Sequence, residues 1–272
     1  MKTEINKNEI IFSSVDTLSV PLSLDCGQAF RWSEKSESVW HGVACGKAVD
    51  ILQKDDTLII RGTFEADDAD RWAEYFDLNR DYGKICERLK ADNYLKTAIK
   101  AYPGIRILKQ EPWEALCSFI ISQNNNIPRI KGIIERLCAH FGEDLGNGDF
   151  SFPSAEKLAV LTVEDLAPLR SGFRAKYIID AAQKVANGEV DLKKLHTCDL
   201  DEAREELIKI KGVGAKVAEC ALLYGCGRVD AFPVDVWVRR IMSELYPEGL
   251  PECTQGVEGI AQQYLFHWRR NI

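Results

Sequence analysis

Lys216 and Asp235 are the residues whose types and spacing could support covalent chemistry. Lys216 follows the turn Gly212-Val213-Gly214 and falls in the first turn of an expected helix. There the helix dipole and burial would disfavour an ammonium group and lower its pKa. A neutral amine can attack carbon, so Lys216 is the candidate nucleophile. The more ordinary role of a lysine after a glycine turn is a phosphate contact or a solvated charge.

Asp235 lies nineteen residues after Lys216. A helix rises about 1.5 Å per residue and an extended loop spans about 3.3 Å per residue, so the chain can return Asp235 to the side of Lys216. A carboxylate there could assist deprotonation of the lysine and stabilise positive charge on a sugar ring. Asp235 is equally suited to cap a helix predicted from Val236 to Tyr246, because Asp is a favoured N-cap and Pro233 precedes it. The two roles are compatible.

A helix, a glycine turn and a second helix, over about residues 205–226, must position these groups. Gly212 and Gly214 can adopt backbone angles closed to other residues and bring bare amides close to a ligand. The free N–H groups and positive dipole end of the second helix make this turn an anion site, with phosphate as the expected ligand.

Length, apolar content and cysteine number limit the class of protein that this chain can be. The chain has 272 residues, of which 46% are hydrophobic, enough for two or three packed subdomains. The chain contains no run of 18 apolar residues, so no membrane span is predicted. The first residues also lack the apolar core of a signal peptide. Nine cysteines, an odd number with wide spacing, fit a reducing compartment. We therefore expect an intracellular, monomeric protein without a membrane anchor.

The sequence predicts no metal and no cofactor. After the glycine turn only Cys220, Cys226 and Cys253 remain, too few for a four-cysteine cluster. The four histidines form no HxxxH pair. The net charge of −7 is also unusual for a protein that binds nucleic acid. Such a protein would need a local site of amides and a few arginines, so a function without nucleic acid stays open at this point.

The expected fold class is α+β. An antiparallel sheet domain with helices, residues 1–110, precedes an all-α helical domain, residues 111–272. Strands are predicted at Val39–Ala44, Ala48–Gln53 and Thr57–Arg61, and helices at Asp67–Phe76 and Lys84–Tyr102. From Pro112 onward almost no strand is expected, and the predicted helices are Pro112–Ser122, Arg129–Phe141, Ser154–Leu161, Ala175–Ala186, Asp201–Ile210, Val217–Tyr224, Val236–Tyr246 and Thr254–Trp268. Residues 162–165 also have the composition of a capped helix start.

The chain resembles the helix-hairpin-helix 8-oxoguanine DNA glycosylase/AP lyases. The GVGAK hairpin (residues 212–216) and the PVD loop (residues 233–235) are similar to that family's catalytic segments. Three further blocks match it in the correct order: CGQAFRW (26–32), SQNNNI (122–127) and GFRAKY (172–177). The resemblance runs from about Leu22 to Phe266 and implies double-stranded DNA containing 8-oxoguanine as the partner.

Such an enzyme must extrude the base and fill the gap that it leaves. The resemblance implies that Asn124 enters the gap, Phe173 wedges the stack, and Arg129 and Arg174 hold the orphaned cytosine. The donors of asparagine and arginine and the flat ring of phenylalanine suit these tasks. Taken alone, the asparagine triplet that begins at Asn124 would more often be a polar interhelical loop.

The resemblance also implies a base pocket. The Gly27 carbonyl would accept N7–H of 8-oxoguanine, a donor that guanine lacks, and an unmatched acceptor would penalise guanine. Gln262 would read the Watson–Crick edge, while Cys220 and Phe266 would sandwich the ring. Each has an ordinary alternative: Gly27 as a turn, Cys220 and Phe266 as helix core, and Gln262 as solvated surface.

Four residues depart from the family pattern. Lys211 stands where proline is common and could add a phosphate contact, while Trp237 replaces a histidine and puts a phosphate contact in doubt. Phe173 replaces a frequent tyrosine and keeps a stacking ring, and Pro128 replaces a small residue beside Arg129 and could alter the approach to the opposite cytosine.

The implied reaction is excision through a Schiff base on Lys216, with strand nicking by β-elimination. One rival is a monofunctional glycosylase for alkylated bases, in which water attacks and only Asp235 is needed. A second is a non-catalytic hairpin module that binds DNA backbones. Lys216 argues against the first rival, and the second leaves Gln262 and the asparagine triplet unexplained.

Overall fold

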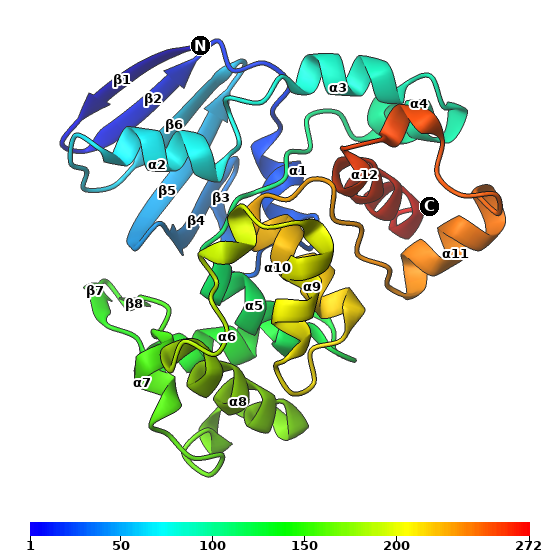
Figure 1. Ribbon diagram of the computed structural model, residues 1–272. Helices are drawn as coiled ribbons and strands as arrows, with labels where there is room; N and C mark the ends of the chain where they lie inside the picture. Colours follow the sequence, from blue (N-terminus) through cyan, green and yellow to red (C-terminus); the bar gives the residue numbers. More distant parts are fainter.

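The computed structural model describes residues 1–272. Its N-terminal part is a six-stranded antiparallel sheet with strand order β1-β2-β6-β5-β4-β3 (Figure 1). The strands are β1 (Lys2–Asn6), β2 (Glu9–Ser13), β3 (Trp32–Ser36), β4 (Val39–Ala44), β5 (Lys47–Lys54) and β6 (Thr57–Arg61). The three predicted strands correspond to β4, β5 and β6, and the sequence missed the other three.

Two of the three missed strands, β1 and β3, lack the alternation that reveals a half-buried strand. Every residue of β1 is exposed, and all of β3 after Trp32 is exposed. An edge strand of this kind pairs through its backbone while its side chains face solvent. In contrast, β2 alternates, with Ile10 and Phe12 fully buried.

Helix α2 (Asp68–Tyr75) covers one face of the sheet (Figure 1). Its Trp72 packs edge-on to Trp32 of β3, with ring centroids 6.5 Å apart. These residues belong to a core cluster of 21 buried residues formed by the sheet, α2 and the short helix α1 (Val20–Asp25), which was not predicted. Burial of large aromatic rings therefore holds the sheet and its helix together.

The remainder of the chain is mainly helical. Its α-helices are α3 (Tyr82–Leu89), α4 (Asn93–Ala101), α5 (Pro112–Ser122), α6 (Ile127–Phe141), α7 (Ala155–Ala159), α8 (Ala175–Ala186), α9 (Leu200–Ile208), α10 (Ala215–Cys226), α11 (Val236–Leu245) and α12 (Glu258–Arg270). A second core cluster, of 50 buried residues, lies among them. In it α10 packs on α5, and α12 packs on α4 and α11.

Two expectations about these elements were wrong. The helix predicted from Lys84 to Tyr102 is two helices, because the Asp92 side chain accepts the amides of Tyr94 and Leu95 and caps a new helix there. Residues 162–165 form turns rather than an α-helix and lead into the 3₁₀ helix η1 (Ala167–Leu169).

The helical part also contains a small hairpin, β7 (Asp144–Gly146) and β8 (Asp149–Phe150). Asn147 and Gly148 both have positive φ, 57° and 86°. An Asn-Gly pair of this kind is the strongest short-range hairpin signal, and the sequence prediction overlooked it.

The two core clusters do not divide the chain at one point. Helices α3 and α4 contribute to the larger cluster, although they precede residue 110 in the chain. The domain boundary near residue 110 therefore stays a proposal from sequence. No helix of the structure combines the length and apolar character needed to cross a membrane.

Candidate active site on the helix-hairpin-helix

Helices α9 and α10 and the turn between them form the predicted hairpin. Gly212 has φ +80°, and a Cβ added to it would lie 2.5 Å from the Tyr177 ring, so glycine is required by both conformation and space. Gly214 is the N-cap of α10 and no side chain caps that end of the helix. The Lys211 backbone amide donates to Asp180 Oδ2 at 2.7 Å, while its side chain is exposed.

Lys216 is the second residue of α10, as the sequence predicted within one turn. Its Nζ donates to Ser122 Oγ at 3.4 Å and lies 5.1 Å from the centroid of the Phe119 ring. Lys216 makes no ion pair with any carboxylate within 4.0 Å. The amine is therefore half-buried against α5 without a fixed counter-charge.

Asp235 is the N-cap of α11, and its Oδ1 accepts the Val238 amide at 2.8 Å. The capping role is therefore present, whereas the direct contact with Lys216 that the sequence allowed is not formed. Both Lys216 and Asp235 nevertheless act electrostatically on the Cys220 thiol. Burial raises the pKa of the Cys220 thiol to about 11, the Lys216 ammonium opposes the shift, and the Asp235 carboxylate adds to it. The Cys220 thiol is therefore neutral at pH 7.

Of the residues predicted for the base pocket, Gly27 and Phe266 lie beside each other, whereas Cys220 lies on α10 and Gln262 on α12. Gly27 follows α1 with φ +86°, and a Cβ built on it would lie 3.8 Å from Phe266 Cε1. Gln262 is 4% exposed and its Oε1 has no hydrogen-bond partner. The alternative of Gln262 as solvated surface is therefore wrong. Cys220 is buried, and Phe266 is half-buried.

Two glutamines hold this pocket together, and the sequence analysis did not assign them a role. The buried Gln28 side chain donates to the carbonyls of Ser23 (2.8 Å) and Arg106 (2.7 Å) and accepts the Leu108 amide at 2.9 Å. Gln263 donates to the carbonyl of Cys26 at 3.2 Å, which ties α12 to the Gly27 segment. Apart from Ser23, their partners are backbone groups distant in the sequence. The sequence alone therefore gave no role to Gln263, and Gln28 stood out only as part of the CGQAFRW block.

The asparagine triplet forms the loop between α5 and α6. Asn124 is exposed with φ 47°, a conformation that asparagine tolerates, and Asn126 caps α6 by accepting the Arg129 amide at 3.0 Å. The predicted loop-and-cap role is thus real, and it leaves the Asn124 side chain facing solvent.

Arg174 differs from its expected role as a free contact for the opposite base. It is 2% exposed and donates to the carbonyls of Gln123, Asn124 (2.8 Å) and Ser171 (3.1 Å). Buried guanidinium donors need acceptors, so Arg174 shapes the asparagine loop. Phe173 beside it is 46% exposed.

Arg129 is exposed, and its guanidinium donates to the Arg170 carbonyl at 3.4 Å. Trp237 on α11 is 38% exposed, with the Arg240 guanidinium 5.5 Å from its ring. No group of three or more His, Cys, Asp or Glu side chains is arranged to hold a metal ion.

Comparisons with known proteins cover the whole chain. The family model "8-oxoguanine DNA glycosylase, N-terminal domain" matches residues 10–116, and the model of HhH-GPD superfamily base excision DNA repair proteins matches residues 117–252. The N-glycosylase/DNA lyase of Saccharomyces cerevisiae is 34% identical over 273 residues, which cover 90% of this chain and 70% of the yeast protein.

The chain belongs to the helix-hairpin-helix 8-oxoguanine DNA glycosylase/lyase family.

Two solved relatives share the fold of this glycosylase. The Clostridium acetobutylicum 8-oxoguanine glycosylase/lyase, in complex with double-stranded DNA containing cytosine opposite 8-oxoG, is 36% identical with a TM-score of 0.91, covering 100% of this chain and 98% of that one. MBOgg1 in complex with a low-affinity DNA ligand is 43% identical with a TM-score of 0.93, covering 99% and 98%. The predicted family, fold class, enzyme class and double-stranded DNA partner of the glycosylase are confirmed.

Proposed function

We propose that Lys216 is the nucleophile with which this glycosylase excises 8-oxoguanine and nicks the DNA strand. The supporting observation is the position of its amine, which lies in the first turn of α10, beside Cys220 of the base pocket and without a carboxylate partner.

The reaction has two stages. The neutral Lys216 amine forms a bond to C1′ of the flipped nucleotide as the glycosidic bond breaks and 8-oxoguanine departs. The Asp235 carboxylate stabilises the positive charge that develops on the sugar. Ring opening leaves a Schiff base on Lys216, which acidifies the C2′ protons. Loss of one such proton expels the 3′ phosphate and cuts the strand.

The base pocket supplies the selectivity in this proposal. The unpartnered Gln262 Oε1 is a buried acceptor whose desolvation costs about 1–3 kcal/mol until a donor arrives. The N–H groups on the Watson–Crick edge of an oxidised guanine are such donors. The Gly27 carbonyl then accepts N7–H, which is present in 8-oxoguanine and absent from guanine.

Exposed residues around the site would hold the distorted DNA. Asn124 enters the vacated space, Phe173 replaces lost stacking, and Arg129 reaches the opposite base, with Arg174 supporting the asparagine loop from behind. The bare amides at Gly212 and Gly214, with Lys211, bind backbone phosphate. A monomer that works at the genome, in the cytoplasm and nucleoid or in the nucleus, fits this role.

Borohydride trapping tests the nucleophile. Wild-type protein incubated with an 8-oxoguanine duplex and borohydride should form a covalent adduct, and Lys216→Gln protein should form none. Asp235→Asn should slow excision by about 100-fold or more while leaving DNA binding intact.

Other outcomes identify the rivals. Excision by wild-type protein without any adduct would contradict the lyase assignment. Excision of alkylated bases that survives Lys216→Gln but not Asp235→Asn would indicate the monofunctional glycosylase. Binding to abasic DNA without excision of any lesion would indicate a non-catalytic module.

A further inference from the structure

Glu219 is a buried carboxylate on the catalytic helix that the reaction above does not use. It lies in α10, one turn after Lys216 and directly before Cys220, and is 7% exposed. Buried carboxylates are rare unless they are paired and hydrogen-bonded. Its surroundings therefore indicate what it does.

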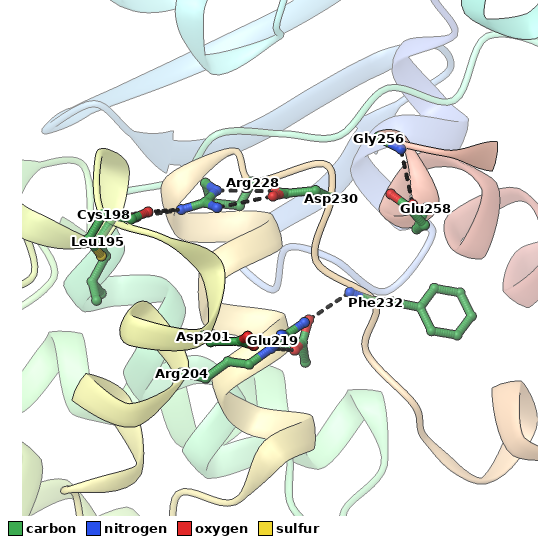
Figure 2. Close-up of polar contacts among 10 residues, drawn as sticks. All are labelled: Leu195, Cys198, Asp201, Arg204, Glu219, Arg228, Asp230, Phe232, Gly256 and Glu258. Atoms are coloured by element: carbon green, nitrogen blue, oxygen red, sulfur yellow. Dashed lines mark hydrogen bonds and ion pairs between the residues drawn. The ribbon is translucent and has the colours of Figure 1, made fainter.

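Both oxygens of Glu219 are used, and each joins α10 to a different segment (Figure 2). Oε1 pairs with Nε of Arg204 on α9, and Arg204 also pairs with Asp201 at 2.5 Å. Oε2 accepts the backbone amide of Phe232 at 2.6 Å. One side chain thus links both hairpin helices to the loop that returns toward Asp235.

That loop, residues 227–235, is anchored in two places. Its first part is fixed by Arg228, which donates to the Cys198 carbonyl at 2.8 Å and pairs with Asp230 at 3.0 Å (Figure 2). The Val229 carbonyl also accepts the Gly259 amide at 2.8 Å. The amide of Phe232 is the last backbone donor of the loop to be bonded before the Asp235 cap.

Glu219 consequently closes a short path between the two catalytic groups. Lys216 and Glu219 are three residues apart on one rigid helix, and Phe232 and Asp235 are three residues apart in a loop that contains Pro233. The hydrogen bond recorded between these two segments runs from the Phe232 amide to Glu219. A change in that bond would move the Asp235 carboxylate relative to the Lys216 amine.

We propose that Glu219 is a positioning residue that sets the separation of the Lys216 amine and the Asp235 carboxylate during base excision. This inference rests on the proposed function of those two residues. A displacement of about 1 Å in a reacting group costs on the order of 100-fold in rate. Glu219→Gln keeps the size of the side chain but turns an N–H pair toward either Arg204 or the Phe232 amide, so one of the two bonds is lost.

Glu206 provides a matched control. It is also buried, at 9% exposed, accepts the backbone amide of Asp191 at 3.0 Å, and pairs with Lys209 at 2.7 Å. Its bonds are of the same chemical kind, but they lie between α9 and the segment after α8 and do not reach the Asp235 loop. Glu206→Gln therefore reports the purely structural cost of losing such a carboxylate.

Three measurements on the full-length protein test the proposal. They are single-turnover excision from an 8-oxoguanine duplex, borohydride trapping on a preformed abasic-site duplex, and thermal unfolding. Trapping on the abasic site needs the Lys216 amine but no departure of the base. We expect Glu219→Gln to slow excision about 10- to 100-fold, to keep trapping within about threefold of wild type, and to lower the melting temperature as much as Glu206→Gln does.

Equal excision rates for Glu219→Gln and Glu206→Gln would overturn the proposal, as would a parallel loss of excision and trapping. If Glu219→Gln does not fold, Arg204→Lys serves in its place, because it keeps the cation but loses the Nε–H contact. It should then slow excision and spare trapping, and an unchanged excision rate would overturn the proposal. Failure of the wild-type protein to excise 8-oxoguanine would instead contradict the proposed function.

Discussion

The proposed selectivity for the oxidised base depends on the Gly27 carbonyl. Its φ of +86° costs any other residue about 1–2 kcal/mol. An added Cβ would meet only ordinary contacts at 3.6–3.8 Å, so Gly27→Ala should fold. Relaxation of the strained backbone would turn the carbonyl away from N7–H. We expect reduced discrimination between 8-oxoguanine and guanine in competitive binding, with abasic-site trapping retained.

Gly256→Ala is the control for this substitution. Gly256 has φ +75° and nothing lies within 4 Å of its added Cβ, so the backbone strain is similar but remote from the pocket. Loss of discrimination in both variants, or in neither, would contradict the role of the Gly27 carbonyl.

At the residue scale, the sequence could single out a residue when its type and its neighbours in the sequence were sufficient evidence. Lys216 could be identified from its place after a glycine turn, and Asp235 from its suitability as a cap. Glu219 and Gln263 could not, because their partners are backbone groups of Phe232 and Cys26 that only the folded chain brings near. Arg174 was predicted as a contact for the opposite base, and its burial could not be read from the sequence because it depends on the asparagine loop folding over it.

At the scale of elements, we expect alanine substitutions at the two hairpin glycines to differ in their effect on stability. Gly212→Ala would place a methyl group 2.5 Å from the Tyr177 ring at positive φ, and we expect it to lower the free energy of unfolding by about 1–3 kcal/mol. Gly214→Ala meets nothing within 4 Å at φ −105° and should change stability by less than about 0.5 kcal/mol. Urea denaturation of both variants measures this. Equal destabilisation would show that the turn is not fixed by the Tyr177 contact.

The boundaries of elements were predictable where periodicity and capping agree. Helices α5 and α8 have the predicted bounds, because proline opens the first and a continuous apolar stripe defines the second. The single helix predicted over residues 84–102 was wrong because its apolar pattern continues past Asp92, whose capping bonds start a new helix there. The exposed strand β1 carried no pattern that could be read.

At the scale of the whole molecule, a histidine joins the sheet to the helical part. His41 on β4 contacts Asp50 of β5 through Nδ1 at 2.6 Å and Asp149 of the β7–β8 hairpin through Nε2 at 3.1 Å. Arg31 adds a bond to the Phe150 carbonyl of the same hairpin. The sequence predicted neither the hairpin nor this junction, because the His41 and Asp149 contact spans 108 residues of chain.

This junction predicts a pH dependence of stability. Burial lowers the pKa of His41, but the hydrogen bonds that His41 donates to the Asp50 and Asp149 carboxylates outweigh it and leave the pKa above its ordinary value. A raised folded-state pKa means that the stabilisation is complete below the ordinary value of about 6.5 and is lost as the pH rises through the folded pKa. The difference in free energy of unfolding between wild type and His41→Asn should therefore be larger at pH 5.5 than at pH 8.5 in urea denaturation. A difference for His41→Asn that does not vary with pH would mean that the imidazolium form does not hold the hairpin to the sheet.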